Sequence, residues 1–235
     1  MKIALLIAAY NEIEGMKAIL PRIKKEWVDE ILVVDGGSTD GSIEYAKKCG
    51  FNVLCQKRKG LLGGYVEAID HIKADAVITF SPDGNSIPEM LPSLVLKMRE
   101  GYDMVIASRY IGDAKSDDDD FMTAFGNKMF TFMINLLYGS SYTDTLVIYR
   151  GWKKEVFKEM GIGKHIAFLE KVFYSRAGAE PLLCIRAAKR KLKCVDIPGD
   201  EPVRIGGCRK LQIFVGGFSI LFLIIREFFS KKWAK

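Results

Sequence analysis

The sequence predicts an α/β fold in which a mostly parallel sheet is flanked by helices. Short runs rich in β-branched and large apolar residues alternate with segments of helical periodicity through the first half of the chain. Such alternation is typical of parallel strands joined by crossover helices. The composition, 49% hydrophobic and 27% charged, is that of a globular protein and excludes disordered and collagen-like chains. The length of 235 residues fits one such domain with a short appendage.

The first half of the chain supplies five strands and four helices in alternation. Each strand is short and apolar enough to be buried on both faces. The expected strands are 2–8, 30–34, 52–54, 76–80 and 104–107. The expected helices are 13–25, 41–49, 63–73 and 88–99. Sheets of this kind bind ligands beyond the carboxyl ends of their strands, so functional residues are expected there.

The pattern changes after residue 109. A polar loop at 112–120 precedes an apolar helix at 121–138, and the run Asp117–Asp120 is expected to be a solvated loop. The apolar stripe of helix 121–138 is expected to pack into the core, with a membrane-facing element as the alternative. Later expected elements are a strand at 146–149, helices at 167–176 and 181–191, and a last strand at 193–197.

The C-terminal segment differs from the rest of the chain. Residues 211–229 are mostly apolar and would form a helix of roughly 28 Å, which is barely long enough to span a membrane. Polar residues interrupt the run, and basic residues flank both of its ends, against the positive-inside tendency. We therefore expect a helix that lies in the membrane interface, with a marginal span and a soluble packing or dimer helix as alternatives. The expected domains are 1–210 and a membrane-associating helix at 211–235.

Charge is distributed unevenly along the chain. Residues 186–235 hold 12 basic and 4 acidic residues, whereas the first 185 residues are nearly neutral. A basic segment on a neutral body indicates an anionic partner that is either phosphate-rich or a membrane surface, and we expect no nucleic-acid partner. The five cysteines include no C-x-x-C pair, which disfavours a disulfide framework or a zinc ribbon and indicates a reducing setting.

A glycine-rich turn follows the second expected strand. Its spacing, G-G-x-x-x-G, differs from the dinucleotide fingerprint, and the turn lacks the Lys-Ser/Thr pair that a P-loop requires. What remains is Asp35 at the end of a strand, in a turn that Thr39 or Asp40 caps into the next helix. A carboxylate at this place can accept hydrogen bonds from a nucleobase N–H or from ribose hydroxyls.

Two more groups of polar residues follow strand ends. Asp83 and Asn85 come after the fourth expected strand, and their oxygens suit a hard divalent cation that is shared with a pyrophosphate. Tyr10, Asn11 and Glu12 follow the first strand. Each group alone has a plain alternative, namely an ordinary turn at Asp83 and a helix cap at Asn11 or Glu12. Together they place polar groups at three strand ends, where the ligand is expected.

These runs are similar to those of the family 2 glycosyltransferases with a GT-A fold. Within that family the chain most resembles the dolichol-phosphate, or polyprenyl-phosphate, mannose synthase group, and the resemblance covers nearly the whole chain. The runs that carry it are AAYNE at 8–12, VVDGGSTDGS at 33–42, SPDGN at 81–85, ASRY at 107–110, TDTLVIYR at 143–150, FLE at 168–170 and RIGGCRKL at 204–211.

The resemblance implies a role for individual residues. The residues implied to bind the nucleotide-sugar donor are Ala8, Tyr10, Asn11, Glu12, Val34, Asp35, Pro82, Asp83 and Arg109. Mg²⁺ or Mn²⁺ would be bound by Asp83 and Asn85, and the acceptor phosphate by Arg204 and Lys210. The implied catalytic residues are Asp83, Asp144 and Glu170. The last two look like positioning residues or weak bases, and the alternative for each is a structural salt bridge.

Three positions depart from the family pattern. Ala8 stands in place of a proline, and Ile148 and Tyr149 stand in place of Gly-Phe before an arginine. Ser81 replaces the first aspartate of the D-x-D motif, which leaves one carboxylate for the metal. This replacement leaves the metal affinity and the donor preference open, although a hydroxyl can still bind a metal-bound water.

The resemblance implies a metal-dependent, inverting transfer of a sugar from GDP-mannose or a UDP-sugar to a polyprenyl or dolichyl phosphate at the cytoplasmic face of the membrane. The leaving diphosphate needs cationic groups around it. A phosphate acceptor is largely ionised at neutral pH and needs no strong base. The alternatives are a family 2 glycosyltransferase with a glycan or glycolipid hydroxyl acceptor, which would need a general base, and a non-catalytic nucleotide-sugar binder.

Overall fold

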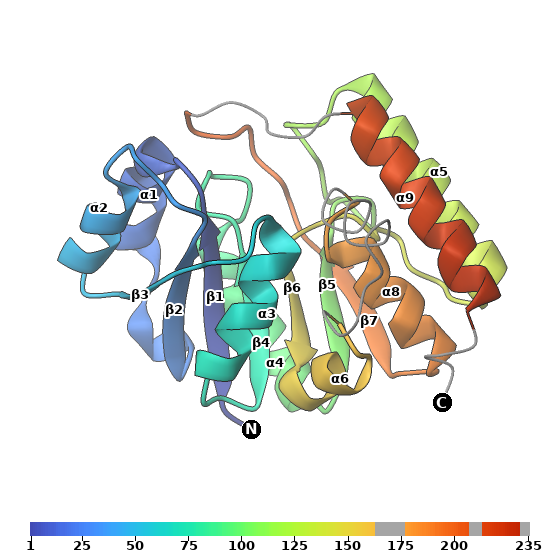
Figure 1. Cartoon of the computed structure of the whole chain (residues 1–235), viewed down its shortest axis with the longest axis horizontal. Helices are drawn as coiled ribbons and strands as arrows, with labels where there is room; N and C mark the ends of the chain where they lie inside the picture. Colours follow the sequence, from blue (N-terminus) through green and yellow to red (C-terminus); the bar gives the residue numbers. More distant parts are fainter. Residues whose placement is uncertain (163–176, 207–212, 231–235) are drawn as a thin grey trace.

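A computed structural model of the chain describes residues 1–162, 177–206 and 213–230 (Figure 1). The described residues form a seven-stranded sheet in the order β3-β2-β1-β4-β6-β5-β7. The strands are β1 (Ile3–Ala9), β2 (Glu30–Asp35), β3 (Asn52–Cys55), β4 (Ala76–Phe80), β5 (Met104–Ser108), β6 (Arg150–Lys153) and β7 (Cys194–Pro198). Strand β6 runs antiparallel to β4 and β5, and the other neighbouring pairs are parallel, so the expected mostly parallel sheet is confirmed.

Helices flank this sheet on both faces. The described α-helices are α1 (Ile13–Ile19), α2 (Ser42–Lys48), α3 (Leu61–His71), α4 (Leu91–Arg99), α5 (Phe121–Tyr138), α6 (Lys154–Glu159), α8 (Glu180–Lys189) and α9 (Ile213–Phe229). Short 3₁₀ turns are η1 (Leu20–Arg22), η2 (Lys25–Trp27) and η3 (Pro88–Met90). In Figure 1, α3 lies in front of the sheet and α4 behind it, while α5, α8 and α9 gather beyond the β5–β7 end.

The central strands β1, β2 and β4 determine where the predicted donor-site residues lie. Every residue of β4 is buried, as are the first five residues of β1, because parallel strands are covered on both faces. The register pairs Ala9 with Asp35 and Ile7 with Phe80. Strands β1, β2 and β4 therefore end at the same edge of the sheet, and the three polar loops that follow them start there.

Two expected elements differ from the structure by more than three residues at one end or both. Helix 13–25 ends as α1 at Ile19, because Pro21 lacks the backbone N–H that would continue it, and the separate turn η1 begins at Leu20. The strand expected at 146–149 begins instead at Arg150. The residues before it form a turn in which the Asp144 carboxylate accepts the backbone N–H of Val147 at 3.1 Å. The expected helix at 167–176 lies outside the described residues.

The apolar stripe of α5 faces outward, so the prediction that it packs into the core is wrong. Phe121, Phe125 and Leu136 are 85%, 56% and 69% exposed. The buried face of α5 instead carries Asn127 and Thr131, together with Phe130 and Ile134. Buried polar groups need partners, and the protein supplies them from the turn around residue 144. These polar contacts fix which face of the helix turns inward.

Helix α9 packs against α5 and α8 and runs alongside α5 (Figure 1). Its Glu227 is fully buried and pairs with Arg186 of α8 at 2.8 Å. Lys189 of α8 donates to the backbone carbonyls of Glu227 and Ser230, at the end of the helix. Within the described ranges, no helix is both long and apolar enough to cross a membrane. The outer face of α9 exposes large side chains, including Phe214 and Phe218.

The buried ion pair between α8 and α9 gives a stability prediction. Replacing Glu227 with Ala leaves the buried charge of Arg186 without this carboxylate, so the free energy of unfolding should fall by about 3–5 kcal/mol in urea denaturation. The matched control is Glu159→Ala, because Glu159 pairs with Arg190 while 57% of its side chain is exposed. The control should lose less than about 1 kcal/mol. Equal losses in the two variants would contradict this account of how α9 is held.

Candidate donor site

Hydrogen bonds join the loop after β1 to the loop after β2. The backbone N–H of Asn11 donates to Ser38 Oγ at 2.8 Å, and the N–H of Glu12 donates to Ser42 Oγ at 3.0 Å. The Asn11 side-chain oxygen accepts the N–H of Thr39 at 2.8 Å. Asn11 has a φ of 53°, a left-handed conformation that asparagine tolerates better than most residues. The two loops therefore form one connected wall.

Asp35 organises the turn that follows β2. Its carboxylate is buried and accepts the backbone N–H groups of Gly37 and Ser38 at 2.8 and 2.7 Å. The Ser38 hydroxyl donates a third hydrogen bond at 2.6 Å. Gly37 has a φ of 96°, which glycine adopts without strain. A contact between Asp35 and a nucleobase stays a prediction, and the geometry adds a structural role to it.

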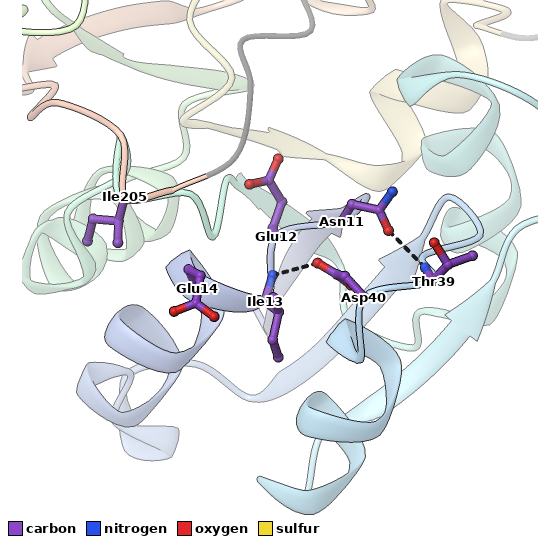
Figure 2. Close-up of a pocket in the computed structure, with 7 residues that line it drawn as sticks. All are labelled: Asn11, Glu12, Ile13, Glu14, Thr39, Asp40 and Ile205. Carbon is purple, nitrogen blue, oxygen red and sulfur yellow. Dashed lines mark hydrogen bonds between the residues drawn. The ribbon is translucent and has the colours of Figure 1, made fainter.

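A pocket of about 360 Å³ lies between these loops (Figure 2). Its lining residues are Asn11, Glu12, Ile13, Glu14, Thr39, Asp40 and Ile205. Burial raises the pKa of Asp40, but hydrogen bonds from Ser42 and Ile13 outweigh it and lower the pKa below its ordinary value. A wall with three carboxylates suits a ligand that donates hydrogen bonds, such as a nucleobase or a ribose, and repels phosphate. Tyr10 stands next to the pocket residues in sequence and is half exposed.

The pair predicted to bind a cation lies at the end of β4. Asp83 is 5% exposed, and the backbone N–H of Asn85 donates to its Oδ1 at 3.1 Å. The Nη2 of Arg204 lies 3.2 Å from Asp83 Oδ2 and 3.2 Å from Asn85 Oδ1. A cationic group therefore contacts both predicted ligands, and their binding of a metal ion stays a prediction.

The donor set fits Mg²⁺ or Mn²⁺ with help from a ligand. In the part of the chain that the structure describes, no group of three or more His, Cys, Asp or Glu residues could hold a metal ion. Magnesium in proteins is commonly held by one or two carboxylates together with substrate phosphates and water. Asp83 and Asn85 would supply the protein's share of such a shell.

A second polar centre surrounds Arg109, after β5. Its guanidinium lies 2.6 Å from Asp144, 2.9 Å from Glu201 and 3.3 Å from Asp119, and its side chain is 9% exposed. Asn127 of α5 donates to Asp144 at 2.8 Å. Burial alone would raise the pKa of Asp144, but the charge and hydrogen bonds of Arg109, with that of Asn127, lower it below its ordinary value.

This geometry bears on the roles inferred for Arg109 and Asp144. In this conformation three carboxylates hold the Arg109 guanidinium, and its contact with a donor phosphate stays a prediction. Asp144 is fully buried in an ion pair, which is the alternative considered for it. An ionised, fully buried carboxylate in this arrangement is a poor proton acceptor, so the geometry favours a positioning role.

The acidic run 117–120 is only partly solvated, so that expectation is wrong for its middle. The Asp119 side chain is 6% exposed against Arg109, and that of Asp118 is 12% exposed with an oxygen 3.8 Å from Arg204 Nε. Asp120 caps α5 by accepting the N–H of Thr123 at 2.8 Å. The two middle carboxylates, Asp118 and Asp119, therefore each face an arginine, Arg204 and Arg109 respectively.

The structure brings most of the predicted donor residues to one edge. Ala8 and Val34 lie near the ends of β1 and β2, and Pro82 is buried directly before Asp83. Glu170 and Lys210 lie outside the described residues. Sequence reasoning missed the site residues Asp40, Ile205, Asp119, Glu201 and Asn127. Asp40 and Ile205 belong to the recognised runs at 33–42 and 204–211, so proximity to those runs was the available signal.

The family model described as Glycosyl transferase family 2 matches residues 4–161, about two thirds of the chain. The chain belongs to glycosyltransferase family 2. One relative of this family 2 chain is the glycosyltransferase AglJ of Haloferax volcanii, 27% identical over 225 residues, which are 90% of this chain and 71% of the relative. Another is the undecaprenyl-phosphate 4-deoxy-4-formamido-L-arabinose transferase of Salmonella choleraesuis, 24% identical over 268 residues, with coverage of 99% and 79%.

Solved structures show the same fold. Glucosyl-3-phosphoglycerate synthase from Mycobacterium tuberculosis, in complex with Mn²⁺, UDP and phosphoglyceric acid, matches with a TM-score of 0.69 and 19% identity. The match covers 97% of this chain and 78% of that one. A complex of the same enzyme with Mg²⁺ and UDP matches with a TM-score of 0.67 and 18% identity over 96% of this chain and 79% of that one. The mixed seven-stranded sheet of this family 2 enzyme is thus GT-A-like, as the resemblance implied.

The Arg109–Asp144 pair gives a pH-dependent prediction. The lowered pKa of Asp144 means that the pair stabilises the fold fully above the unfolded pKa of about 4, and that this contribution is lost as pH falls through the lowered value. Asp144→Asn should therefore lower the free energy of unfolding by about 3–5 kcal/mol at pH 7.

Urea denaturation from pH 7 down to pH 2 checks this. The difference between the wild type and Asp144→Asn should persist at pH 4 and shrink only below it. The control is Asp70→Asn, because Asp70 is 73% exposed in its pair with Lys158. A loss at Asp144 no larger than the loss at Asp70 would contradict the assigned role.

Proposed function

We propose that this family 2 glycosyltransferase transfers a sugar from a nucleotide-sugar to the phosphate of a polyprenyl phosphate, at the cytoplasmic face of a membrane. The observation that carries the proposal is the edge of the sheet, where a carboxylate-lined pocket lies beside the Asp83–Asn85 pair. The printed name of one relative, an undecaprenyl-phosphate sugar transferase, supports the acceptor class. GDP-mannose or a UDP-sugar is the proposed donor.

The donor would be oriented by charge. Its nucleoside enters the pocket, where Glu12 and Asp40 accept hydrogen bonds from base and ribose. Asp35, at the end of β2, is a further proposed contact, and Tyr10 covers the base. Its diphosphate is repelled by those carboxylates and turns toward Arg204. The sugar is then presented between the end of β4 and the loop at 112–120. The acidic pocket at one end and the basic Arg204 at the other would thus set the orientation of the donor.

The diphosphate would leave with the help of Mg²⁺ or Mn²⁺, held by Asp83 and Asn85. When bound, such an ion stabilises the negative charge that develops on the leaving group. Complexes of the similar Mycobacterium tuberculosis enzyme with Mn²⁺ or Mg²⁺ support the choice of a divalent cation. Ser81 leaves Asp83 as the one carboxylate of this turn, so the chain holds the ion through few ligands of its own.

A phosphate acceptor suits the chemistry of the described residues. An acceptor hydroxyl would need a general base, and Asp144 is committed to Arg109 with a lowered pKa. A lipid phosphate is largely ionised at neutral pH and attacks the sugar without losing a proton first. Arg204 and Lys210 would offset the repulsion between the acceptor phosphate and the donor diphosphate.

The lipid part of the acceptor would be met by the outer surface of α5 and α9. We name this surface the α5–α9 face, which consists mainly of Phe121, Phe125, Phe132, Phe214, Phe218 and Phe229. All six side chains are more than half exposed, and the two helices lie side by side (Figure 1). Several large apolar side chains exposed on neighbouring helices are typical of an interaction site. Helices with one apolar face can lie in a membrane interface.

Asp83 provides the first test of the proposed site. In Asp83→Ala, we expect release of nucleoside diphosphate in the presence of Mn²⁺ and a short-chain polyprenyl phosphate to fall by at least about 10²-fold, since the leaving group loses its main support. Asp70→Ala, an exposed aspartate on α3, is the control and should keep full activity. Full activity of Asp83→Ala would refute the assigned site.

Two further variants separate phosphate from hydroxyl acceptors. If the acceptor is a phosphate, Glu170→Gln and Asp144→Asn should reduce turnover only partly, because no strong base is needed. If the acceptor is a hydroxyl, one of the two residues must act as its general base, and either Glu170→Gln or Asp144→Asn should abolish turnover. The measurement is the initial rate of nucleoside diphosphate release, with circular dichroism to confirm that each variant is folded.

Vesicle flotation tests the α5–α9 face. The double variant Phe125→Glu/Phe218→Glu should bind anionic vesicles at least about tenfold less than the wild type, since burial of each aromatic side chain contributes about 1.5–3 kcal/mol. The matched control is Leu96→Glu on α4, because Leu96 is 60% exposed and lies outside this face. Equal binding by the double variant and the wild type would contradict a membrane role for the face.

A further inference from the structure

The chain after β7 crosses over the donor site. Residues 202–206, which we call the strap, return from β7 to the edge where β1, β2 and β4 end. The Asn85 side chain donates to the carbonyl of Pro202 at 2.8 Å, and the N–H of Ile205 donates to the carbonyl of Asp83 at 2.6 Å. Figure 2 shows Ile205 at the wall of the pocket. The strap therefore contacts both the cation ligands and the nucleoside pocket.

The strap fits closely on the loop after β4. A Cβ on Gly84 would lie 2.8 Å from Cγ1 of Ile205, closer than real contacts allow. Gly206 is as close to the first turn of α1, since a Cβ there would lie 2.9 Å from Cβ of Glu14. Both glycines have positive φ values, 96° and 68°. The described conformation is thus a packed, closed one, in which the strap leaves little room over Asp83.

Arg204 places its charge on the two oxygens that a metal ion would use. Its Nη2 is 3.2 Å from Asp83 Oδ2 and 3.2 Å from Asn85 Oδ1. A guanidinium and a divalent cation repel each other and would draw on the same oxygens, so they exclude one another from this position. The competition is sharp because Ser81 leaves Asp83 as the one carboxylate of the turn at 81–86.

The root of the strap is fixed, whereas Arg204 has a second partner within reach. Glu201 is held by Arg109 at 2.9 Å and by the Ser116 hydroxyl at 2.5 Å. The backbone N–H of Arg204 donates to Asp118 Oδ1 at 3.2 Å, and its Nε lies 3.8 Å from the same carboxylate. If the guanidinium leaves Asp83, Asp118 is a second carboxylate that can keep it near the edge of the site.

We propose that Arg204 is a resident cation that closes the metal position until a divalent cation and the donor diphosphate displace it, and that it thereby lowers the affinity of the free enzyme for metal. The displaced guanidinium is then available to the acceptor phosphate, a second step that rests on the proposed function. Donor and metal thus bind before the acceptor. Only molecules in which Arg204 has left the site can bind the metal ion, so the apparent metal affinity is the intrinsic affinity multiplied by the fraction of such molecules.

Metal binding without acceptor tests the competition. Mn²⁺ binding is measured by electron paramagnetic resonance with neither nucleotide nor lipid present, so no turnover occurs. Arg204→Gln should bind Mn²⁺ about tenfold more tightly than the wild type, because the competing charge is gone. Arg204→Lys keeps the charge and should stay near the wild type. The control is Arg22→Gln, because Arg22 pairs with Glu89 at the surface and not with Asp83 or Asn85, and it should bind as the wild type does.

The outcomes decide the inference separately from the proposed function. Unchanged or weaker Mn²⁺ binding by Arg204→Gln would overturn the competition, as would equally tight binding by Arg204→Gln and Arg204→Lys. Tighter Mn²⁺ binding by Arg204→Gln alone would support it, even if no lipid phosphate serves as acceptor. With a working acceptor, the same Arg204→Gln variant should turn over more slowly than the wild type although it binds metal better.

Discussion

A buried guanidinium, that of Arg109, connects the functional parts of this molecule. A buried charge is costly unless carboxylates surround it, and here they come from three segments that are far apart in sequence. Asp144 precedes β6, Asp119 lies in the loop before α5, and Glu201 forms the root of the strap. Through Asn127, the same network orients α5. The apolar helix, the acidic loop and the strap are therefore positioned relative to the donor site by one ion cluster.

The consequence is a surface divided by charge and polarity. Carboxylates line the pocket proposed for the nucleoside, the Arg204–Asp83 pair marks the place proposed for the diphosphate, and the α5–α9 face is apolar. These three regions match the three parts of the proposed reactants, namely nucleoside, phosphates and lipid. The exposed apolar surface is the observation that favours the proposed lipid acceptor over a soluble one. The fold alone favours neither, since one fold hosts many acceptors.

The sequence predicted the strand ends well because parallel strands place their carboxyl ends at one edge, so Asp35, Asp83 and Asn11 could be grouped from chain order alone. The sequence-based prediction chose the wrong buried face for α5. Hydrophobicity favoured the apolar stripe, but the opposite face is buried because Asn127 on it donates a hydrogen bond to the buried Asp144. Glu201 was missed because its partner is 92 residues away, a distance that no local pattern reports.

The central claim is that a lipid phosphate, and not a hydroxyl, receives the sugar. It is tested most directly by comparing a short-chain polyprenyl phosphate with the same polyprenol lacking its phosphate, across a panel of GDP- and UDP-sugars with Mn²⁺ or Mg²⁺. We predict release of nucleoside diphosphate, and formation of a lipid-linked sugar, only when both the phosphate and the divalent cation are present. Equal rates with the polyprenol, or donor binding with no turnover on any lipid phosphate, would contradict the account.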